Sequence, residues 1–180
     1  MIQENVWYDA NKNEDLVNER RKIQDLCFEF NQKRPSAKSE RDVLLHKILG
    51  YETQNVEIIS PFLCDYGKNI HFGQDVFVNS NGYFMDGAKI CIGNHVYIGP
   101  NCGFYTANHP MDVTLRNQGY EMACPIVIED NVWIGAHVCV MPGVTIGANS
   151  VIAAGSVVTK DIPSNVLAAG VPCVVKKELL

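Results

Sequence analysis

The chain has 180 residues, of which 47% are apolar and 19% charged, and its formal net charge at pH 7 is −5. That length suits one domain with an ample core, and the apolar content excludes a disordered chain. The acidic balance argues against a nucleic-acid partner, because phosphate binding requires a basic surface. Residues 1–50 hold 18 of the 35 charged residues but only one of the 14 glycines, so the chain has two distinct parts.

No basic segment followed by an apolar stretch opens the chain, and no window reaches the roughly 18 apolar residues of a membrane helix. The seven cysteines are odd in number, form no CxxC pair and mostly lie among Val and Ile, which indicates reduced thiols. No metal-ligand spacing is visible. We therefore expect a cytoplasmic protein with neither a membrane partner nor a bound metal.

Two amphipathic helices are predicted in the N-terminal part. In residues 15–31, apolar residues recur near the helical period, at Leu16, Ile23, Leu26, Cys27 and Phe30. A second helix is expected to begin at Ser39 as N-cap, with Asp42 completing a capping box, and to end at Gly50. Two such short helices are too small to fold alone, so they must pack on the rest of the chain.

From Phe72 onward the apolar period changes to six. Aliphatic residues recur at Ile128, Ile134, Val140, Ile146, Ile152 and Val158, and earlier sets run through Ile92, Ile98 and Phe104 and through Phe72, Val78 and Phe84. The earliest set is two positions out of phase with the next. Three short strands joined by tight turns close one triangular coil of about 18 residues. The pattern therefore predicts a β-solenoid, with Gly, Ala, Asn and Asp at corners that need positive φ.

The hexad pattern lapses at residues 105–127, where a loop should project from the solenoid. This loop contains His109, followed by Pro110, and Arg116. His71, His95 and His137 fall at corner or outward positions and His46 on a charged helix, so His109 is the histidine favoured for chemistry. Loops on rigid scaffolds commonly carry functional sites.

The period resembles that of the hexapeptide-repeat acyltransferases. Six segments narrow the resemblance to the maltose/galactoside O-acetyltransferase family: YDAN (8–11), PFLCDYG (61–67), FVNSN (77–81), NHP (108–110) with Arg116, NVWIG (131–135) and AAGVPC (168–173). The resemblance implies a left-handed parallel β-helix over 56–180, with a loop inserted at 105–127 and a helical cap at 1–55. It further implies a homotrimer with sites between neighbouring subunits.

Carried over residue by residue, the resemblance makes His109 the catalytic base for direct acetyl transfer from acetyl-CoA. A histidine pKa of about 6.5 suits that task at neutral pH. Asp9, Asp65 and Asn79 match positions that bind the acceptor sugar. Asp65 could instead cap its turn, and Asn79 could form a corner ladder. Trp133 points outward, either as a wall of the cleft or as a trimer contact.

On the donor side, four positions match residues that contact acetyl-CoA in the family: Ala136, Ala154, Thr159 and Lys160. Lys177 is added as a donor-binding candidate because of its charge. Lys160 and the pair at 176–177 are the only basic residues after Arg116, which suits the CoA phosphates. The chain departs from the family's pattern at three positions. Ala136 replaces a hydroxyl residue of some members, Val174 stands where an arginine is frequent, and Gly87 follows Asp86 where galactoside enzymes carry a second acid.

The leading hypothesis is an acetyl-CoA-dependent O-acetyltransferase that acts on a sugar hydroxyl. A related enzyme could use serine or an antibiotic as the acceptor, although serine acetyltransferases have a longer helical N-terminal region. A zinc carbonic anhydrase on this fold would need three converging histidines, and no such spacing is present. A non-catalytic scaffold subunit is the remaining alternative.

Overall fold

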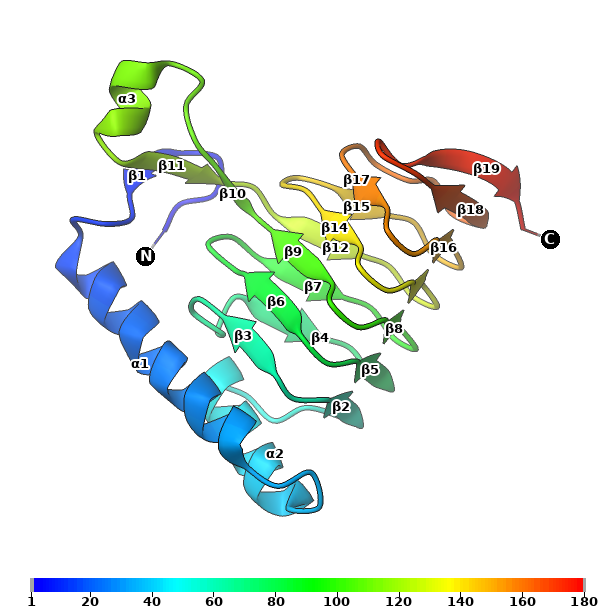
Figure 1. Cartoon of the computed structure of the whole chain (residues 1–180), viewed down its shortest axis with the longest axis horizontal. Coiled ribbons are helices and arrows are strands. Elements are labelled where there is room, and N and C mark those ends of the chain that lie inside the picture. Colours follow the sequence, from blue (N-terminus) through cyan, green and yellow to red (C-terminus); the bar gives the residue numbers. More distant parts are fainter. Residues whose placement is uncertain (1, 180) are drawn as a thin grey trace.

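The computed structural model describes residues 2–179, which form a three-sided β-prism covered at one end by two helices (Figure 1). The first sheet of the prism contains β2 (Val56–Ile58), β5 (Val76–Val78), β8 (Tyr97–Ile98), β13 (Trp133–Ile134), β16 (Val151–Ile152), β18 (Val166–Ala169) and β19 (Val174–Glu178). The second sheet contains β3 (Phe62–Cys64), β6 (Gly82–Met85), β9 (Gly103–Tyr105), β14 (Cys139–Val140) and β17 (Val157–Val158). The third contains β4 (Ile70–Phe72), β7 (Ile90–Ile92), β12 (Ile126–Ile128) and β15 (Thr145–Ile146).

Neighbouring strands within each of these sheets pair in parallel, except the terminal β18–β19 pair, which is antiparallel. Equivalent residues of successive coils therefore stack in register. In the second sheet this column runs through Cys64, Phe84, Phe104, Val140 and Val158, all fully buried. The rings of Phe84 and Phe104 stack with centroids 4.6 Å apart. The predicted hexad core is thus confirmed.

The strands of the prism begin at Val56, before Phe72, where the six-residue period becomes visible in the sequence. The turn from the second to the third sheet explains why. Its flanking core residues Phe84 and Ile92 are eight positions apart, whereas Val140 and Ile146 in a later coil are six apart. The longer turns in the early coils cause the two-position phase shift seen in the sequence.

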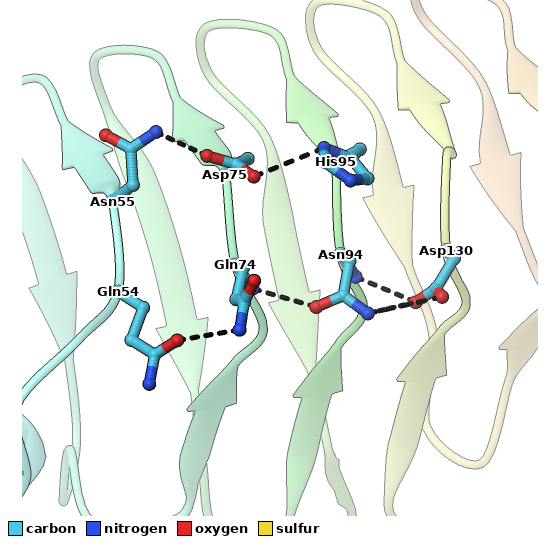
Figure 2. A network of polar contacts seen from close by, with 7 residues as sticks. All are labelled: Gln54, Asn55, Gln74, Asp75, Asn94, His95 and Asp130. Carbon is cyan, nitrogen blue, oxygen red and sulfur yellow. Dashed lines mark hydrogen bonds and ion pairs between the residues drawn. The ribbon is translucent and has the colours of Figure 1, made fainter.

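The corners between the third and first sheets are held by side-chain ladders (Figure 2). Gln74 Nε2 donates to Gln54 Oε1 at 2.7 Å, and Gln74 N donates to Asn94 Oδ1 at 2.9 Å. The adjacent row places His95 Nδ1 3.5 Å from Asp75 Oδ2. Both residues have positive φ, as do Asn residues at the equivalent corners, which confirms the predicted use of Asn and Asp there.

The cap consists of α1 (Glu14–Gln32) and α2 (Lys38–Leu49). Cys27 and Phe30 on α1 are buried against the prism, and the Asn31 side chain pairs with both the N–H and the C=O of Phe62 at the start of β3. The prediction of Ser39 as N-cap is wrong. The helix begins at Lys38, one residue before Ser39, so Ala37 is the N-cap. Its methyl side chain makes no cap bond.

The insertion after β9 forms an arm that projects from the prism (Figure 1). It contains β10 (Ala107–Asn108), the short helix α3 (Val113–Asn117) and β11 (Tyr120–Ala123). β11 pairs antiparallel with β10 and with β1 (Trp7–Asp9), so the N-terminus is bound to the arm. In the described part of the chain, no helix has the length and apolarity to cross a membrane.

Candidate active site

His109 lies on the arm just after β10, and its side chain is exposed. Its Nδ1 atom is 3.1 Å from the carbonyl oxygen of Tyr120 on β11. A carbonyl oxygen can only accept, so the neutral imidazole places its proton on Nδ1 and leaves the Nε2 lone pair free. Arg116 stabilises the turn by donating to the carbonyl oxygens of Pro110 and Met111 at 3.2 and 3.3 Å.

Asp9 belongs to the same small sheet, because it pairs with Tyr120 in the β1–β11 register. Its Oδ1 accepts the N–H groups of Asn11 and Lys12 at 3.0 and 2.9 Å, and these bonds lower the pKa of Asp9. The structure therefore places Asp9 one strand from the backbone group that orients His109. The carboxylate also caps its own turn.

A pair of carboxylates lies between the arm and the prism. The Tyr83 hydroxyl donates to Asp65 Oδ1 at 3.0 Å, and the Tyr8 hydroxyl bonds to Glu121 on β11. Burial raises the pKa of Asp65, and the charge of Glu121 raises it further. Burial and then the bond to Glu121 also raise the pKa of Tyr8. The side chain of Asp65 is thus hydrogen-bonded to the hydroxyl of Tyr83.

The sequence does not indicate that Glu121 and Tyr8 lie at the candidate site. The available signal was an acidic residue inside the β-strand that closes the insertion, where apolar neighbours would suit packing better. Neither its partner Tyr8 nor its proximity to Asp65 follows from spacing, because 113 positions separate Tyr8 from Glu121.

Asp86 and Gly87 lie beneath this pair in the turn after β6. Asp86 is fully buried, so its side chain has no exposed surface with which to contact an acceptor. A Cβ atom on Gly87 would lie 3.0 Å from the Tyr8 hydroxyl and 3.2 Å from Ala123 Cβ. Tyr8 thus occupies the space that a second acid after Asp86 would require.

A second group of predicted residues lies at the corner between the first and second sheets. Asn79 follows β5, and Ala136 and Ala154 follow β13 and β16 in later coils. Gly135 is required there, because a Cβ atom on it would lie 2.6 Å from Ala154 N. Asn79 Oδ1 accepts the N–H of Ser80 at 2.8 Å, while the corner ladder runs instead from Asn81 to Asn101.

Trp133 points outward from β13 with 58% of its surface exposed. In register beside it lie Tyr97, which is 56% exposed, and Val151. Phe77 precedes Tyr97 in the same row. We call these four residues the apolar stripe, and they run across the outer face of the first sheet. Exposed apolar rows of this kind are typical of protein–protein interfaces.

The predicted donor residues Thr159 and Lys160 follow β17 at the corner between the second and third sheets, and both are exposed. Lys177 lies on β19, where it pairs with Leu167, and is also exposed. Within residues 2–179, no group of three or more His, Cys, Asp and Glu side chains could hold a metal ion.

The predicted site residues thus form two groups at opposite ends of the second-sheet strands. Asp9, Asp65 and His109 gather where these strands end, and Asn79 and Ala136 lie where they begin. One chain does not bring the two groups together, since a three-residue strand separates them by about 10 Å.

A β-prism of six-residue repeats with an inserted histidine arm defines a hexapeptide-type transferase. Family models bear this out: residues 125–160 match the bacterial transferase hexapeptide (six repeats), and residues 5–51 match the maltose acetyltransferase hexapeptide capping motif. A Staphylococcus aureus protein named as an acetyltransferase is 55% identical over 173 residues, covering 96% of this chain and 87% of the relative.

Two solved structures are similar over nearly the whole chain. A maltose O-acetyltransferase from Clostridium difficile 630 has a TM-score of 0.94 and 42% identity, with full coverage of both chains. A galactoside acetyltransferase in complex with coenzyme A has a TM-score of 0.93 and 41% identity, covering 98% of this chain and 88% of that one. The chain belongs to the hexapeptide-repeat acetyltransferases, close to the maltose and galactoside O-acetyltransferases. The predicted left-handed β-helix with a helical cap is confirmed.

Proposed function

We propose that this acetyltransferase moves the acetyl group of acetyl-CoA to a hydroxyl of a neutral sugar, with His109 as general base. Nε2 of His109 takes the hydroxyl proton as the sugar oxygen attacks the thioester carbonyl carbon. The carbon–sulfur bond then breaks, and the proton passes from the imidazolium to the CoA sulfur. The products are the O-acetyl sugar and free CoA thiol, and no covalent enzyme intermediate is needed.

The observation that carries this proposal is the bond from His109 Nδ1 to the Tyr120 carbonyl oxygen. It fixes the tautomer that a general base needs and aims Nε2 away from the arm backbone. The same strand continues to Glu121, which lies beside Asp65 and Tyr8. Carboxylates near the base suit a polyhydroxylated acceptor, since each can accept hydrogen bonds from paired hydroxyls.

On the donor side, we infer that Ala136, Ala154 and Thr159 line the path of the CoA chain and that Lys160 and Lys177 meet its phosphates. The two lysines are exposed, Lys160 at the corner after β17 and Lys177 on β19. Ala136 offers its backbone N–H as the donor for the developing oxyanion, because its side chain has no hydroxyl.

A homotrimer would complete the site. The neighbouring subunit would bring its Asn79, Ala136 and Trp133 to the arm that carries His109, joining the two groups that one chain keeps apart. The apolar stripe with the exposed Tyr97 and Trp133 supports such a contact, since monomers rarely expose a row of aromatic side chains. We place the reaction in the cytoplasm, where thiols stay reduced.

The decisive test follows free CoA thiol with acetyl-CoA and a panel of mono- and disaccharides, with serine and an aminoglycoside as comparison acceptors. Sugar-dependent release of thiol, with the O-acetyl sugar identified by mass, is the expected result. Release with serine or the aminoglycoside alone would replace the sugar by that acceptor. No release with any acceptor, together with no binding of CoA in calorimetry, would favour a scaffold role.

A further inference from the structure

Asp86 is a buried carboxyl group that the proposed reaction does not use. It stands at the first position of the longer turn after β6 and has no exposed surface. Its Oδ1 atom accepts two backbone N–H groups from the turn of the preceding coil, those of Asp65 at 2.9 Å and Tyr66 at 2.8 Å. In the described structure, its Oδ2 atom is buried without a hydrogen-bond partner.

Asp86 is itself held firmly. The side chain of Asn69 donates to its carbonyl oxygen at 2.6 Å, and Gly87 beside it lies against the Tyr8 hydroxyl. The two longer turns of successive coils are therefore bonded to each other. The turn after β6 fixes the turn after β3, which carries Asp65.

We propose that Asp86 is a positioning residue that fixes the Asp65 turn and thereby sets the affinity for the acceptor, without touching the acceptor. The inference rests on the proposed function, in which Asp65 binds the acceptor. Two constraints then define the direction of the Asp65 carboxylate. Asp86 holds its main chain, and Tyr83 holds its Oδ1 atom.

An acceptor atom is needed at this place because Tyr66 is buried and its N–H donates to Asp86 Oδ1. Loss of that acceptor would leave a buried donor without this partner. Titratable groups face Asp86 from three elements: Cys27 on α1, Cys64 and Asp65 at the end of β3, and Tyr83 on β6. All four of these groups are acids. Burial raises the pKa of Asp86 to about 7 although the two N–H bonds lower it.

The test compares Asp86→Ala and Asp86→Asn with a matched control, Asn31→Ala. Asn31 binds the N–H and C=O of Phe62, at the opposite end of the same strand β3, so its loss removes two similar bonds away from the site. We expect Asp86→Ala to raise the KM for the sugar at least tenfold, while the KM for acetyl-CoA and kcat at saturating sugar stay within about threefold. Asp86→Asn keeps Oδ1 and should remain within about fivefold of the parent. Asn31→Ala should leave the sugar KM within twofold.

Equal rises in the sugar KM for Asn31→Ala and Asp86→Ala would show a merely structural role and overturn the inference. So would a fall in kcat with an unchanged sugar KM. If Asp86→Ala does not fold, Asp86→Leu takes its place, because leucine has a similar volume and no acceptor atom. Faster amide exchange of Asp65 and Tyr66 with a raised sugar KM in Asp86→Leu supports the inference, and unchanged exchange with an unchanged sugar KM overturns it. If the parent acetylates sugar and the Asp86 variants keep the parent's sugar KM, this inference fails while the proposed function stands. A parent that acetylates no sugar removes the proposed function as well.

Discussion

The Nδ1 atom of His109 lies 3.1 Å from the carbonyl oxygen of Tyr120, across the two strands of the arm. The contact ties the orientation of the imidazole to the pairing of β10 with β11. Because Asp9 pairs with Tyr120 from the other side, the N-terminal strand supports the same backbone group. The arm is therefore a small three-stranded sheet that holds the imidazole which we propose as the general base.

Replacing His109 with alanine should lower kcat by about 10²- to 10⁴-fold, the usual contribution of a general base. The side chain is exposed, so the melting temperature should change little. Steady-state rates and thermal unfolding of His109→Ala measure both. His71→Ala, an exposed histidine on β4, is the control and should keep the parent rate. Residual activity of His109→Ala within about tenfold of the parent would contradict the base role.

A site shared between subunits predicts complementation between two inactive variants. His109→Ala lacks the base, and Asn79→Ala lacks a group at the opposite end of the second-sheet strands. When the two chains are unfolded together and refolded, about a quarter of the sites in a randomly mixed closed ring should combine an intact His109 with an intact Asn79. Activity of the mixture should therefore exceed that of either variant alone.

The control for this experiment is each variant refolded by itself, followed by light scattering to verify the same assembly. If the mixture shows only the average of the two separate activities, the site lies within one chain. A monomer in light scattering would also contradict the shared site.

The solenoid could be predicted from the sequence, because three-sided coils produce a six-residue period, whereas its left hand was implied only by the family resemblance. The contacts of Asp86 could not be predicted. Phe84 and Ile92 are separated by eight positions, and this phase shift marks the longer turn that contains Asp86. Each departure from the six-residue period corresponds to extra residues at one corner of the prism. Asp65, Asp86 and His109 all lie in such longer turns or insertions.

Other features of the structure depend on contacts between distant segments and leave no trace in a period. Glu121 bonds to Tyr8, and Asn31 in the cap bonds to the backbone of Phe62. The incorrect N-cap at Ser39 has a local cause. A hydroxyl residue three positions before an acid resembles a capping box wherever it falls, and here Asp42 pairs with Lys38 at 3.1 Å instead.

Lys160 and Lys177 should govern donor affinity, because CoA carries a diphosphate and a 3′-phosphate in a chain with few cations nearby. Each alanine variant should raise the KM for acetyl-CoA about five- to tenfold, with the sugar KM unchanged. Added salt should weaken donor binding in the parent more than in the variants, since it screens the charge that they have lost. Lys47→Ala, exposed on α2, is the control. A KM for acetyl-CoA unchanged in both variants would place the phosphates elsewhere.

The raised pKa of Asp86 also predicts how stability depends on pH. In the folded chain this pKa is about 7, against an ordinary value of 3.8, so the folded state binds the proton more tightly than the unfolded state. The resulting stabilisation is fully present below about pH 4 and is lost as the pH rises through 7. It is at most about 4 kcal/mol, at 1.36 kcal/mol for each pKa unit.

Urea unfolding of the parent and of Asp86→Asn between pH 4 and pH 8 measures this contribution. The parent should lose free energy of unfolding relative to Asp86→Asn as the pH rises from 4 to 7, because only the parent has to ionise a buried carboxyl. Asp130→Asn is the control, since hydrogen bonds from Asn94 lower the pKa of the exposed Asp130. Its carboxylate titrates below pH 4, so its difference from the parent should stay flat over this range. A flat difference for Asp86→Asn as well would mean that Asp86 keeps an ordinary pKa despite its burial.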